Sequence, residues 1–458
     1  MTAAIRSRPA GLLEKYMIAR AQLDYYRSVV VWTEVSAIPP LPVLHAGLAK
    51  LISQHAALRS IVIDAENRSP KIGILDEISL DRLVEVDDDD VSLEDYLVRA
   101  TNVKFDYADH LVPLWKVKLW RSQYVFFICD HAPFDGTSAA IFQRDLLKIV
   151  NNHGTTDAIA NLRVLFDRSV PPAPEIEQLV KISPPVSYVL SVLGSEFGPS
   201  FWPFTSWQSS AKARDPLIWR NYVDVIANQS CKILNFSSQQ AGMLLRACRD
   251  HGTTLTALLN TVLVVAASKA YPSTGGFDTS IPINARRFCL HDDYKNAMGA
   301  YVFQYKEITP AVTDFRWTDV TRFGHALKAG TTYKAGWILG MLKYLFGNIS
   351  EWMEGKIGKE RDNDVEVSNI GTVDFSGITY DDDDDDDDDD DGVEFKVKKI
   401  GFTQPHGILN PPLKLNVAGL LGGAVTIVFG YSDEIVGHGK GELIFNEIKH
   451  LLEQVSDA

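Results

Sequence analysis

A histidine and an aspartate four residues apart are the strongest candidates for chemistry in this sequence. The segment 130–136 reads DHAPFDG and follows a continuous apolar run, 124–129, of the kind that forms a strand buried on both faces. A strand-to-helix junction presents side chains at the edge of a sheet, where ligands often bind. Histidine is the side chain best suited to take up and return a proton near neutral pH, so His131 is a candidate general base. The same spacing also fits a histidine that only ends a strand, and a pattern with three fixed positions recurs by chance.

The residues after His131 suggest a sharp, stiff turn. Pro133 restricts the backbone, and Gly136 is expected to adopt a conformation that other residues resist. Such a turn would point Asp135 away from the reaction centre, where it would anchor the loop. Cys129 lies two residues before His131 on the predicted strand, and we interpret it as a core residue and not as a nucleophile.

The elements that must position this segment can be read from the periodicity of apolar residues. Helices are predicted at 12–26, 44–57, 93–103 and, after Gly136, 137–151. Strands are predicted at 29–35, 59–64, 115–120 and 124–129. The first half of the chain is therefore expected to be an α/β lobe with the motif at its sheet edge.

The second half repeats this organisation. Helices are predicted at 237–251, with Ser237 as N-cap, at 254–270, in parts of 324–357 and at 443–455. Strands are predicted at 231–236, 281–283, 365–368, 393–401 and 413–431. Since 458 residues exceed one ordinary core, we divide the chain into a lobe at 1–170, a crossover at 171–220 rich in proline and aromatic residues, and a lobe at 221–458. The aromatic stretch 197–219 is interpreted as a connecting segment packed on the surface, with a lid or a membrane-touching patch as the alternative.

The net charge of −14 misrepresents the folded body. Residues 381–391 are an unbroken run of aspartate, and without these eleven charges the net charge is −3. The run is predicted to be a solvated loop inserted between two strands, because like charges repel and nothing apolar is buried. Calcium binding by this loop is disfavoured, since a bare aspartate run lacks the carbonyl and glycine geometry of a dedicated site. The remaining body has no basic stripe, so nucleic acid is not expected as a partner.

The other compositional signals indicate an intracellular protein without a metal. The four cysteines, at 129, 231, 248 and 289, form no C-x-x-C pair, so we expect reduced thiols, no zinc site and no disulfide framework. The N-terminus has no apolar signal core, and no apolar run reaches the ~18 residues needed to cross a bilayer. We expect a cytoplasmic monomer, with a loose peripheral contact to membranes or lipid droplets left open.

Several segments in order along the chain resemble the fungal alcohol acetyltransferase family. They are LEKYMIAR at 13–20, LISQHAALR at 51–59, DHAPFDG at 130–136, CRDHGTTLT at 248–256, IPINARRF at 281–288 and VSNIG at 367–371. The resemblance spans nearly the whole chain, and the aspartate run falls outside it. This family belongs to the superfamily of CoA-dependent acyltransferases, which includes chloramphenicol acetyltransferase, the plant BAHD enzymes and condensation domains.

The resemblance implies a fold and a reaction. The fold is α/β, with two similar chloramphenicol-acetyltransferase-like lobes, each a mixed sheet backed by helices, and a tunnel between them. CoA would enter from one side and the acceptor from the other, with His131 midway as the general base. Acetyl-CoA is implied as a co-substrate with no tightly bound cofactor, and the transfer would be direct, without an acyl-enzyme.

The resemblance also implies further site residues. The motif aspartate, Asp135, would pair with an arginine of the second lobe, for which Arg286 is the first candidate and Arg287 the second. Ser368 and Asn369 would lie near the tunnel or an oxyanion site, although a strand end with turn residues explains them equally well. Thr403 and Gln404 are not included in the predicted site.

We expect an acetyl-CoA-dependent O-acetyltransferase that converts a hydrophobic alcohol to its acetate ester. An N-acetyltransferase of a lipid-like or secondary-metabolite amine would use the same machinery, and the sequence does not separate the two. A noncatalytic binding protein on the same fold is the third alternative, and the intact His131, Asp135 and Gly136 argue against it.

Overall fold

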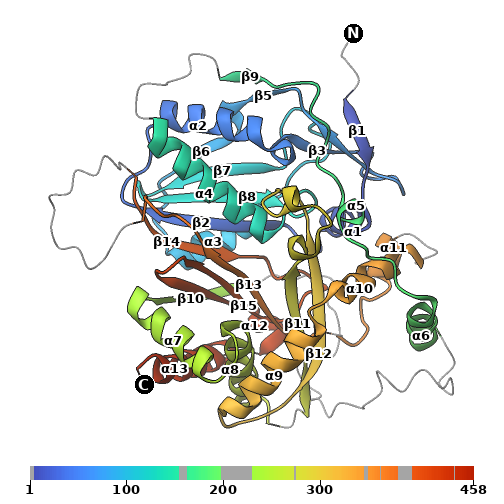
Figure 1. The fold of residues 1–458 in the computed structure, drawn as a ribbon, viewed down its shortest axis with the longest axis vertical. Helices are drawn as coiled ribbons and strands as arrows, with labels where there is room; N and C mark the ends of the chain where they lie inside the picture. Colours follow the sequence, from blue (N-terminus) through green and yellow to red (C-terminus); the bar gives the residue numbers. More distant parts are fainter. Residues whose placement is uncertain are drawn as a thin grey trace.

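Two β-sheets, one above the other in Figure 1, form the cores of two lobes in the computed structural model. The structure describes residues 5–153, 162–197, 229–272, 275–344, 349–361, 363–379, 395–437 and 439–457. The aspartate run at 381–391 and most of the aromatic stretch, residues 198–219, lie outside the described residues. The prediction of two α/β lobes is confirmed within the described ranges.

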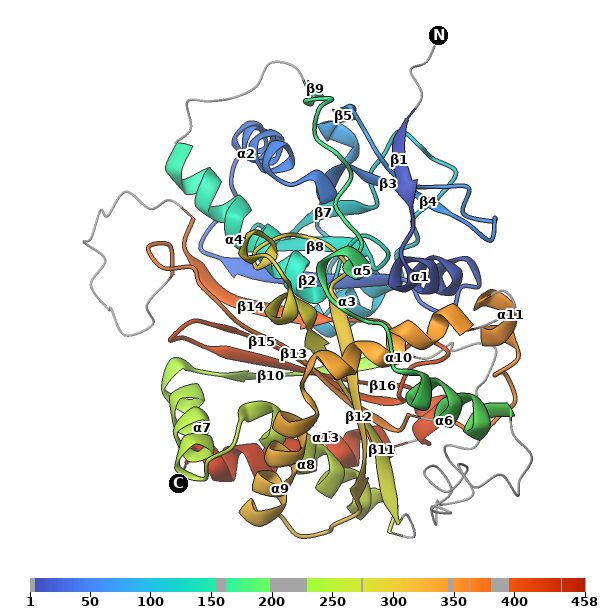
Figure 2. The same ribbon diagram turned by 45° about the vertical axis from the view of Figure 1, so that its right-hand side comes forward.

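The sheet of the first lobe is built around the strand that precedes His131. Its order is β14 (Val397–Thr403), β2 (Ser28–Val35), β8 (Tyr124–Asp130), β7 (Trp115–Trp120) and β6 (Val84–Asp87). β8 pairs antiparallel with both β2 and β7, and six of its seven residues are buried, as its apolar run predicted. The helices α2 (Leu41–Gln54) and α4 (Gly136–His153) pack together over one face of this sheet (Figures 1 and 2).

The sheet of the second lobe is the larger one. Its order is β10 (Ser230–Phe236), β16 (Val425–Tyr431), β15 (Leu413–Leu420), β13 (Val365–Val373), β11 (Gly276–Asn284) and β12 (Val302–Pro310). β13 runs parallel to both of its neighbours, and the other pairs are antiparallel. It is covered by α7 (Ser238–Asp250), α8 (Leu255–Ala270), α9 (Trp317–Gly330) and α13 (Lys440–Ser456) (Figure 2). The predicted N-cap is confirmed, since the Ser237 hydroxyl accepts a hydrogen bond from the Gln240 backbone.

One strand crosses between the lobes. β14 belongs to the part of the chain assigned to the second lobe, but it pairs antiparallel with β2 at the edge of the first sheet. Gly401 of β14 lies directly against the Trp32 ring of β2, where a Cβ would be 2.0 Å from the ring. The residues of β14 read VKKIGFT, and nothing in this pattern assigns the strand to one sheet or the other. A division at residue 221 therefore describes the order of the chain and does not describe the membership of each sheet.

Shorter elements complete the first lobe and the space between the lobes. They are β1 (Arg6–Pro9), α1 (Leu12–Gln22), β3 (Ser60–Ile63), β4 (Lys71–Ile74), β5 (Glu77–Ser79), α3 (Leu93–Thr101), β9 (Arg163–Leu165), α5 (Ile176–Leu179), α6 (Val186–Phe197), α10 (Gly336–Gly340), α11 (Ile349–Glu354) and α12 (Asp433–Val436). The predicted helix 12–26 ends at Gln22 because Asp24 has a φ of 58°, in the left-handed region. The apolar run 413–431 forms two strands, since Gly422 turns the chain between them with a φ of 73°.

Candidate active site

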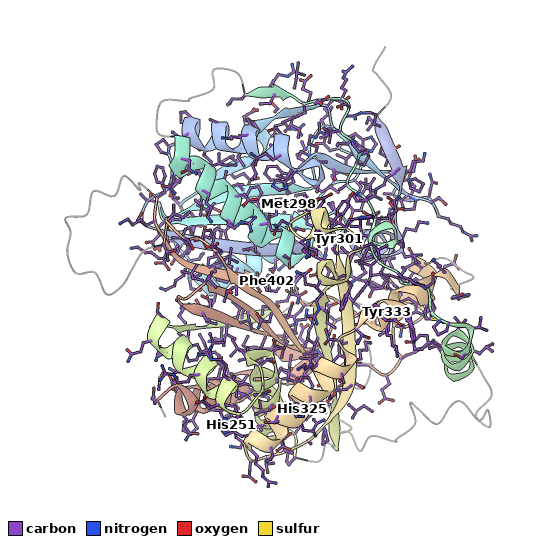
Figure 3. The ribbon with its side chains drawn as sticks, viewed as in Figure 1. His251, Met298, Tyr301, His325, Tyr333 and Phe402 are labelled. Atoms are coloured by element: carbon purple, nitrogen blue, oxygen red, sulfur yellow. The ribbon has the colours of Figure 1, made fainter. Side chains whose placement is uncertain are left out.

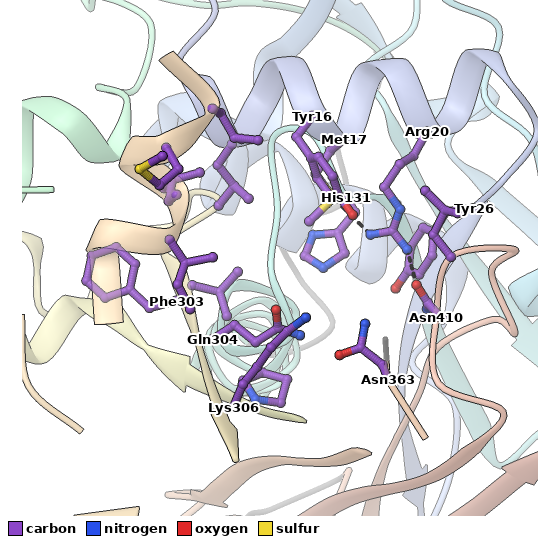
Figure 4. A pocket seen from close by; sticks show the side chains of 18 of the residues that line it. Tyr16, Met17, Arg20, Tyr26, His131, Phe303, Gln304, Lys306, Asn363 and Asn410 are labelled. Atoms are coloured by element: carbon purple, nitrogen blue, oxygen red, sulfur yellow. Dashed lines mark hydrogen bonds between the residues drawn. The ribbon is translucent and has the colours of Figure 1, made fainter. Parts of the chain in front are cut away.

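His131 lies directly after β8, where the first sheet faces the second lobe. Its Nδ1 is 2.7 Å from the backbone carbonyl oxygen of Phe134. A carbonyl oxygen only accepts, so this contact assigns the proton of the neutral ring to Nδ1. The opposite nitrogen, Nε2, is then an unprotonated acceptor on the pocket side of the ring (Figure 4). The loop 131–134 therefore holds the histidine in the tautomer that a general base needs.

A pocket of about 410 Å³ opens in front of this histidine, between the two lobes (Figure 4). Its apolar lining comes mainly from α1, α10 and β12, and includes Leu13, Met17, Phe303, Ile338 and Leu339. Its polar lining comes from α1, β12, β13 with the residues before it, and the segment after β14, and includes Arg20, Gln304, Lys306, Asn363, Glu366, Gln404 and Asn410. A ligand in this space would meet His131 between an apolar and a polar wall.

The surroundings of His131 favour its neutral form. Burial lowers the pKa of the imidazole below its usual 6.5, and the positive charge of Arg20 lowers it further. The negative charge of Asp135 acts in the opposite direction without reversing the shift. The ring is therefore available as a proton acceptor at neutral pH.

Asp135 is turned away from the pocket and ties the two lobes together. Its carboxylate accepts hydrogen bonds from both terminal nitrogens of Arg286, at 2.7 and 3.0 Å, and from the backbone N–H of Tyr301 at 3.0 Å. It also accepts from the backbone N–H of Ser138 at 2.8 Å, as an N-cap of α4 does. Burial by itself would raise the pKa of this carboxyl, but the Arg286 charge and these donors hold it below its usual value.

Arg286 is the partner that the resemblance to the acyltransferase family placed first. Besides Asp135, its guanidinium donates to the Ala297 carbonyl at 2.8 Å, the Ser138 hydroxyl at 2.9 Å and the Gly299 carbonyl at 3.2 Å. Its side chain is 2% exposed. Arg287, the second candidate, is exposed and faces the ring of its neighbour Phe288. The neighbouring Tyr301 and Met298 lie beside α4 in Figure 3, where the second lobe reaches the motif.

Gly136 has a different role from the one expected. Its φ is not in the left-handed region, so no unusual backbone conformation requires it. A Cβ at this position would instead lie 2.7 Å from Cγ2 of Ile370 on β13 and 3.2 Å from the ring of Phe402 on β14. The prediction of a special conformation is therefore wrong, and the glycine allows α4 to approach strands of both sheets.

Ser368 and Asn369 do not reach the pocket. Neither contributes to the lining described above, although Ser368 shares its face of β13 with Glu366. The Asn369 amide donates to the Thr256 hydroxyl at 3.1 Å, and its oxygen accepts from the Gly371 backbone at 2.8 Å. These contacts tie β13 to α8, as expected of a strand end with turn residues.

Cys129 is fully buried, and burial raises the pKa of its thiol. Both observations agree with its interpretation as a core residue, because the thiolate is the nucleophilic form. Among the described residues, no group of three or more His, Cys, Asp or Glu side chains is placed to hold a metal ion. Within the same ranges no one helix is long and apolar enough to cross a bilayer. Only α7 and α8 together have this length and apolar character, and they are bent by 95° relative to each other.

Most of the polar residues that line the pocket were not predicted as site residues, and Gln404 was considered but left out. Arg20 and Tyr26 come from α1 and the loop after it, and Gln404 follows β14. The Tyr26 hydroxyl donates to Gln404 Oε1 at 3.0 Å, and Gln404 Nε2 donates to Glu366 at 2.7 Å. A charged residue within the buried face of a predicted helix was the available signal for Arg20. No signal in the sequence brings Gln404 to Tyr26, because the two are far apart in the chain.

The comparisons with known proteins agree with this geometry. A model of the alcohol acetyltransferase family matches residues 9–456. An uncharacterized protein of Schizosaccharomyces pombe is 25% identical over 475 residues, covering 100% of this chain and 99% of its own.

Solved structures show the same fold. The trichothecene 15-O-acetyltransferase TRI3 of Fusarium sporotrichioides has a TM-score of 0.68 at 12% identity, covering 98% of this chain and 94% of its own. The starter condensation domain of rhizomide synthetase RzmA, solved with C8-CoA and Leu-SNAC, has a TM-score of 0.65 at 12% identity, covering 99% and 95%. The match across 9–456 shows that this chain belongs to the alcohol acetyltransferase family and is an acyltransferase with two chloramphenicol-acetyltransferase-like lobes.

Proposed function

We propose that this protein is an acetyl-CoA-dependent O-acetyltransferase of a hydrophobic alcohol, with His131 as its general base. The observation that carries the proposal is the orientation of the His131 ring. Its Nδ1 is bound to the Phe134 carbonyl, and its unprotonated Nε2 lies toward the pocket. The apolar wall of that pocket suits the hydrocarbon part of an alcohol.

The reaction is a direct transfer. His131 Nε2 takes the proton of the acceptor hydroxyl while the hydroxyl oxygen attacks the thioester carbon. The resulting tetrahedral intermediate collapses with cleavage of the carbon–sulfur bond, and the imidazolium returns the proton to the departing CoA thiolate. No covalent acyl-enzyme is required, which agrees with the buried state of Cys129. Asp135 takes no part in proton transfer, because its carboxylate is occupied by Arg286, Ser138 and Tyr301.

The support from relatives concerns the donor and the reaction class. The family is one of acetyltransferases, and the RzmA domain of the same fold was solved with an acyl-CoA. We therefore take acetyl-CoA as the donor, acting as a co-substrate and not as a resident cofactor.

The test is release of CoA thiol from acetyl-CoA in the presence of a panel of alcohols and amines. We expect His131→Ala to lower kcat about 10²- to 10⁴-fold, the usual contribution of a general base. His325→Ala is the matched control, since His325 is exposed on α9 in the lower part of the second lobe (Figure 3).

Full activity of His131→Ala would contradict the mechanism. Thiol release with amines alone would replace the alcohol by an amine as acceptor. Absence of thiol release with every acceptor would favour the noncatalytic alternative.

A further inference from the structure

Arg20 is a buried cation without an anionic partner among the described residues. It is 5% exposed, and no carboxylate lies within 4.0 Å of its guanidinium in the part of the chain that the structure describes. Its hydrogen bonds reach the Asn410 side-chain oxygen and, at 3.5 Å, the sulfur of Met17. Its Nε has no hydrogen-bond partner in the same part of the chain. A buried charge is costly unless it is paired, so this arginine calls for an explanation.

The carboxylate that lines the same pocket is already engaged. Glu366 accepts from Gln404 at 2.7 Å and from the Ser280 hydroxyl at 3.4 Å. In the pairing of β13 with β15 it also lies opposite Lys414, a fully buried lysine. Glu366 is therefore satisfied by other donors and does not neutralise Arg20.

The charges of the pocket point to an anion. Its described lining carries three basic residues, Arg20, Lys306 and Lys356, and one acidic residue, Glu366. Lys356 lies over the Trp352 ring, so the buried cation of this lining that lacks a counter-charge among the described residues is Arg20. A buried cation at the wall of a pocket attracts a ligand of the opposite charge.

Two aromatic rings fix Arg20 beside His131. The Arg20 Cζ is 4.1 Å from the ring centroid of Tyr26 and 5.3 Å from that of Tyr16. The Tyr26 ring is in turn 5.6 Å from the ring of His131. Figure 4 shows the guanidinium and the imidazole on the same side of the pocket. An anion bound to Arg20 would therefore lie close to the proposed base, since both Arg20 and His131 are neighbours of the Tyr26 ring.

We infer that Arg20 forms an anion subsite for a carboxylate of the acceptor, and that the acceptor is an aliphatic hydroxy acid. Arginine binds carboxylates with two parallel hydrogen bonds, and its terminal nitrogens face the pocket wall shared with Asn410. The hydroxyl must reach His131 while the carboxylate reaches Arg20, so the two groups are separated by a few carbons only. The hydrocarbon chain would lie along Leu13, Phe303 and Leu339.

The phosphates of CoA are the other source of an anion. With the thioester at His131, the whole pantetheine arm separates those phosphates from the reacting carbon, whereas Arg20 lies beside His131. Lys306, which is exposed at the pocket, is better placed for them than the buried Arg20. The assignment of the anion to the acceptor rests on the proposed function, but binding of a carboxylate at Arg20 does not require catalysis.

The binding experiment uses decanoate, decanamide and decan-1-ol as probes in titration calorimetry with the full chain. We expect Arg20→Met to weaken decanoate binding about ten- to a hundredfold and to leave the two neutral probes unchanged. Arg20→Lys should retain part of the affinity, because it keeps the charge and loses the planar fork. Arg249→Met, at an exposed position on α7, is the matched control. Thermal unfolding of each variant checks that it is folded.

The activity experiment compares 3-hydroxydecanoate with its methyl ester and with 10-hydroxydecanoate. We expect 3-hydroxydecanoate to have the lowest KM, and Arg20→Met to raise that KM while the KM of the methyl ester stays unchanged. Equal binding of all three probes by wild type and Arg20→Met would overturn the subsite. A rise in the KM of acetyl-CoA alone would assign the anion to CoA and also overturn it. If decanoate binding depends on Arg20 while no acceptor releases thiol, the subsite stands and the proposed function fails.

Discussion

Two buried arginines, Arg286 and Arg20, have opposite surroundings in this fold. Arg286 is surrounded by acceptors, with the Asp135 carboxylate as its counter-charge. Arg20 has Asn410, Met17 and two tyrosine rings, and none of these carries a negative charge. A fully paired and hydrogen-bonded charge stabilises the structure. A cation at a pocket wall without a counter-charge can bind an anionic ligand. The comparison separates the region that positions His131 from the region that we propose binds the acceptor.

The largest expected effect on stability comes from breaking the Arg286–Asp135 ion pair. Arg286→Met leaves the Asp135 carboxylate buried without a counter-charge, so we expect a loss of about 3–5 kcal/mol in the free energy of unfolding. Urea denaturation of the two proteins measures it. Arg287→Met is the neighbouring control and should change the free energy by about 0.5 kcal/mol or less, since Arg287 is exposed. Similar losses in both variants would remove the distinction between the two arginines.

A smaller effect is expected from Asp135→Asn. The amide still accepts from the Ser138 backbone, but the charge opposite Arg286 is lost, which should cost about 1–3 kcal/mol at neutral pH. The pKa of Asp135 is lowered in the folded protein, so its contribution is present above the usual value of 3.8 and is lost as the pH falls below it. The difference in stability between wild type and variant should therefore narrow in acid.

The pH dependence of activity tests whether Asp135 only positions the loop. The negative charge of Asp135 raises the pKa of His131, so the midpoint of the acid limb of kcat/KM should move to lower pH in Asp135→Asn. A stable Asp135→Asn protein whose acid limb moves to higher pH would count against a positioning role for Asp135.

The smallest effect concerns Arg20 and the acidic limb of activity. Burial and the Arg20 charge both lower the pKa of His131, so activity should fall as the pH drops through a midpoint below 6.5. In Arg20→Met the midpoint should move upward, because one of the two causes is removed while Asp135 still acts on the ring. Profiles of kcat/KM against pH measure the shift. An unchanged midpoint would show that Arg20 does not act on His131.

Part of the fold could be predicted from the sequence, but β12, which lines the pocket, was not among the predicted strands. The apolar run before His131, the helix after Gly136 and the N-cap at Ser237 follow from local patterns, since burial on both faces and capping depend on neighbouring residues. The pairing of β14 with the first sheet could not be predicted, because nothing in its sequence VKKIGFT assigns it to one sheet edge or the other.

The sequence by itself determined the motif: a histidine at a strand end, an aspartate before a helix and a glycine where that helix begins. These depend on residue type and short-range spacing. Only the tertiary structure decided that Gly136 serves close packing against Ile370, that Arg286 reaches Asp135 across the lobes, and that Arg20 faces the pocket without a counter-charge. The reason is physical: these properties depend on what lies opposite each side chain in space, and in each case the partner is distant in the chain.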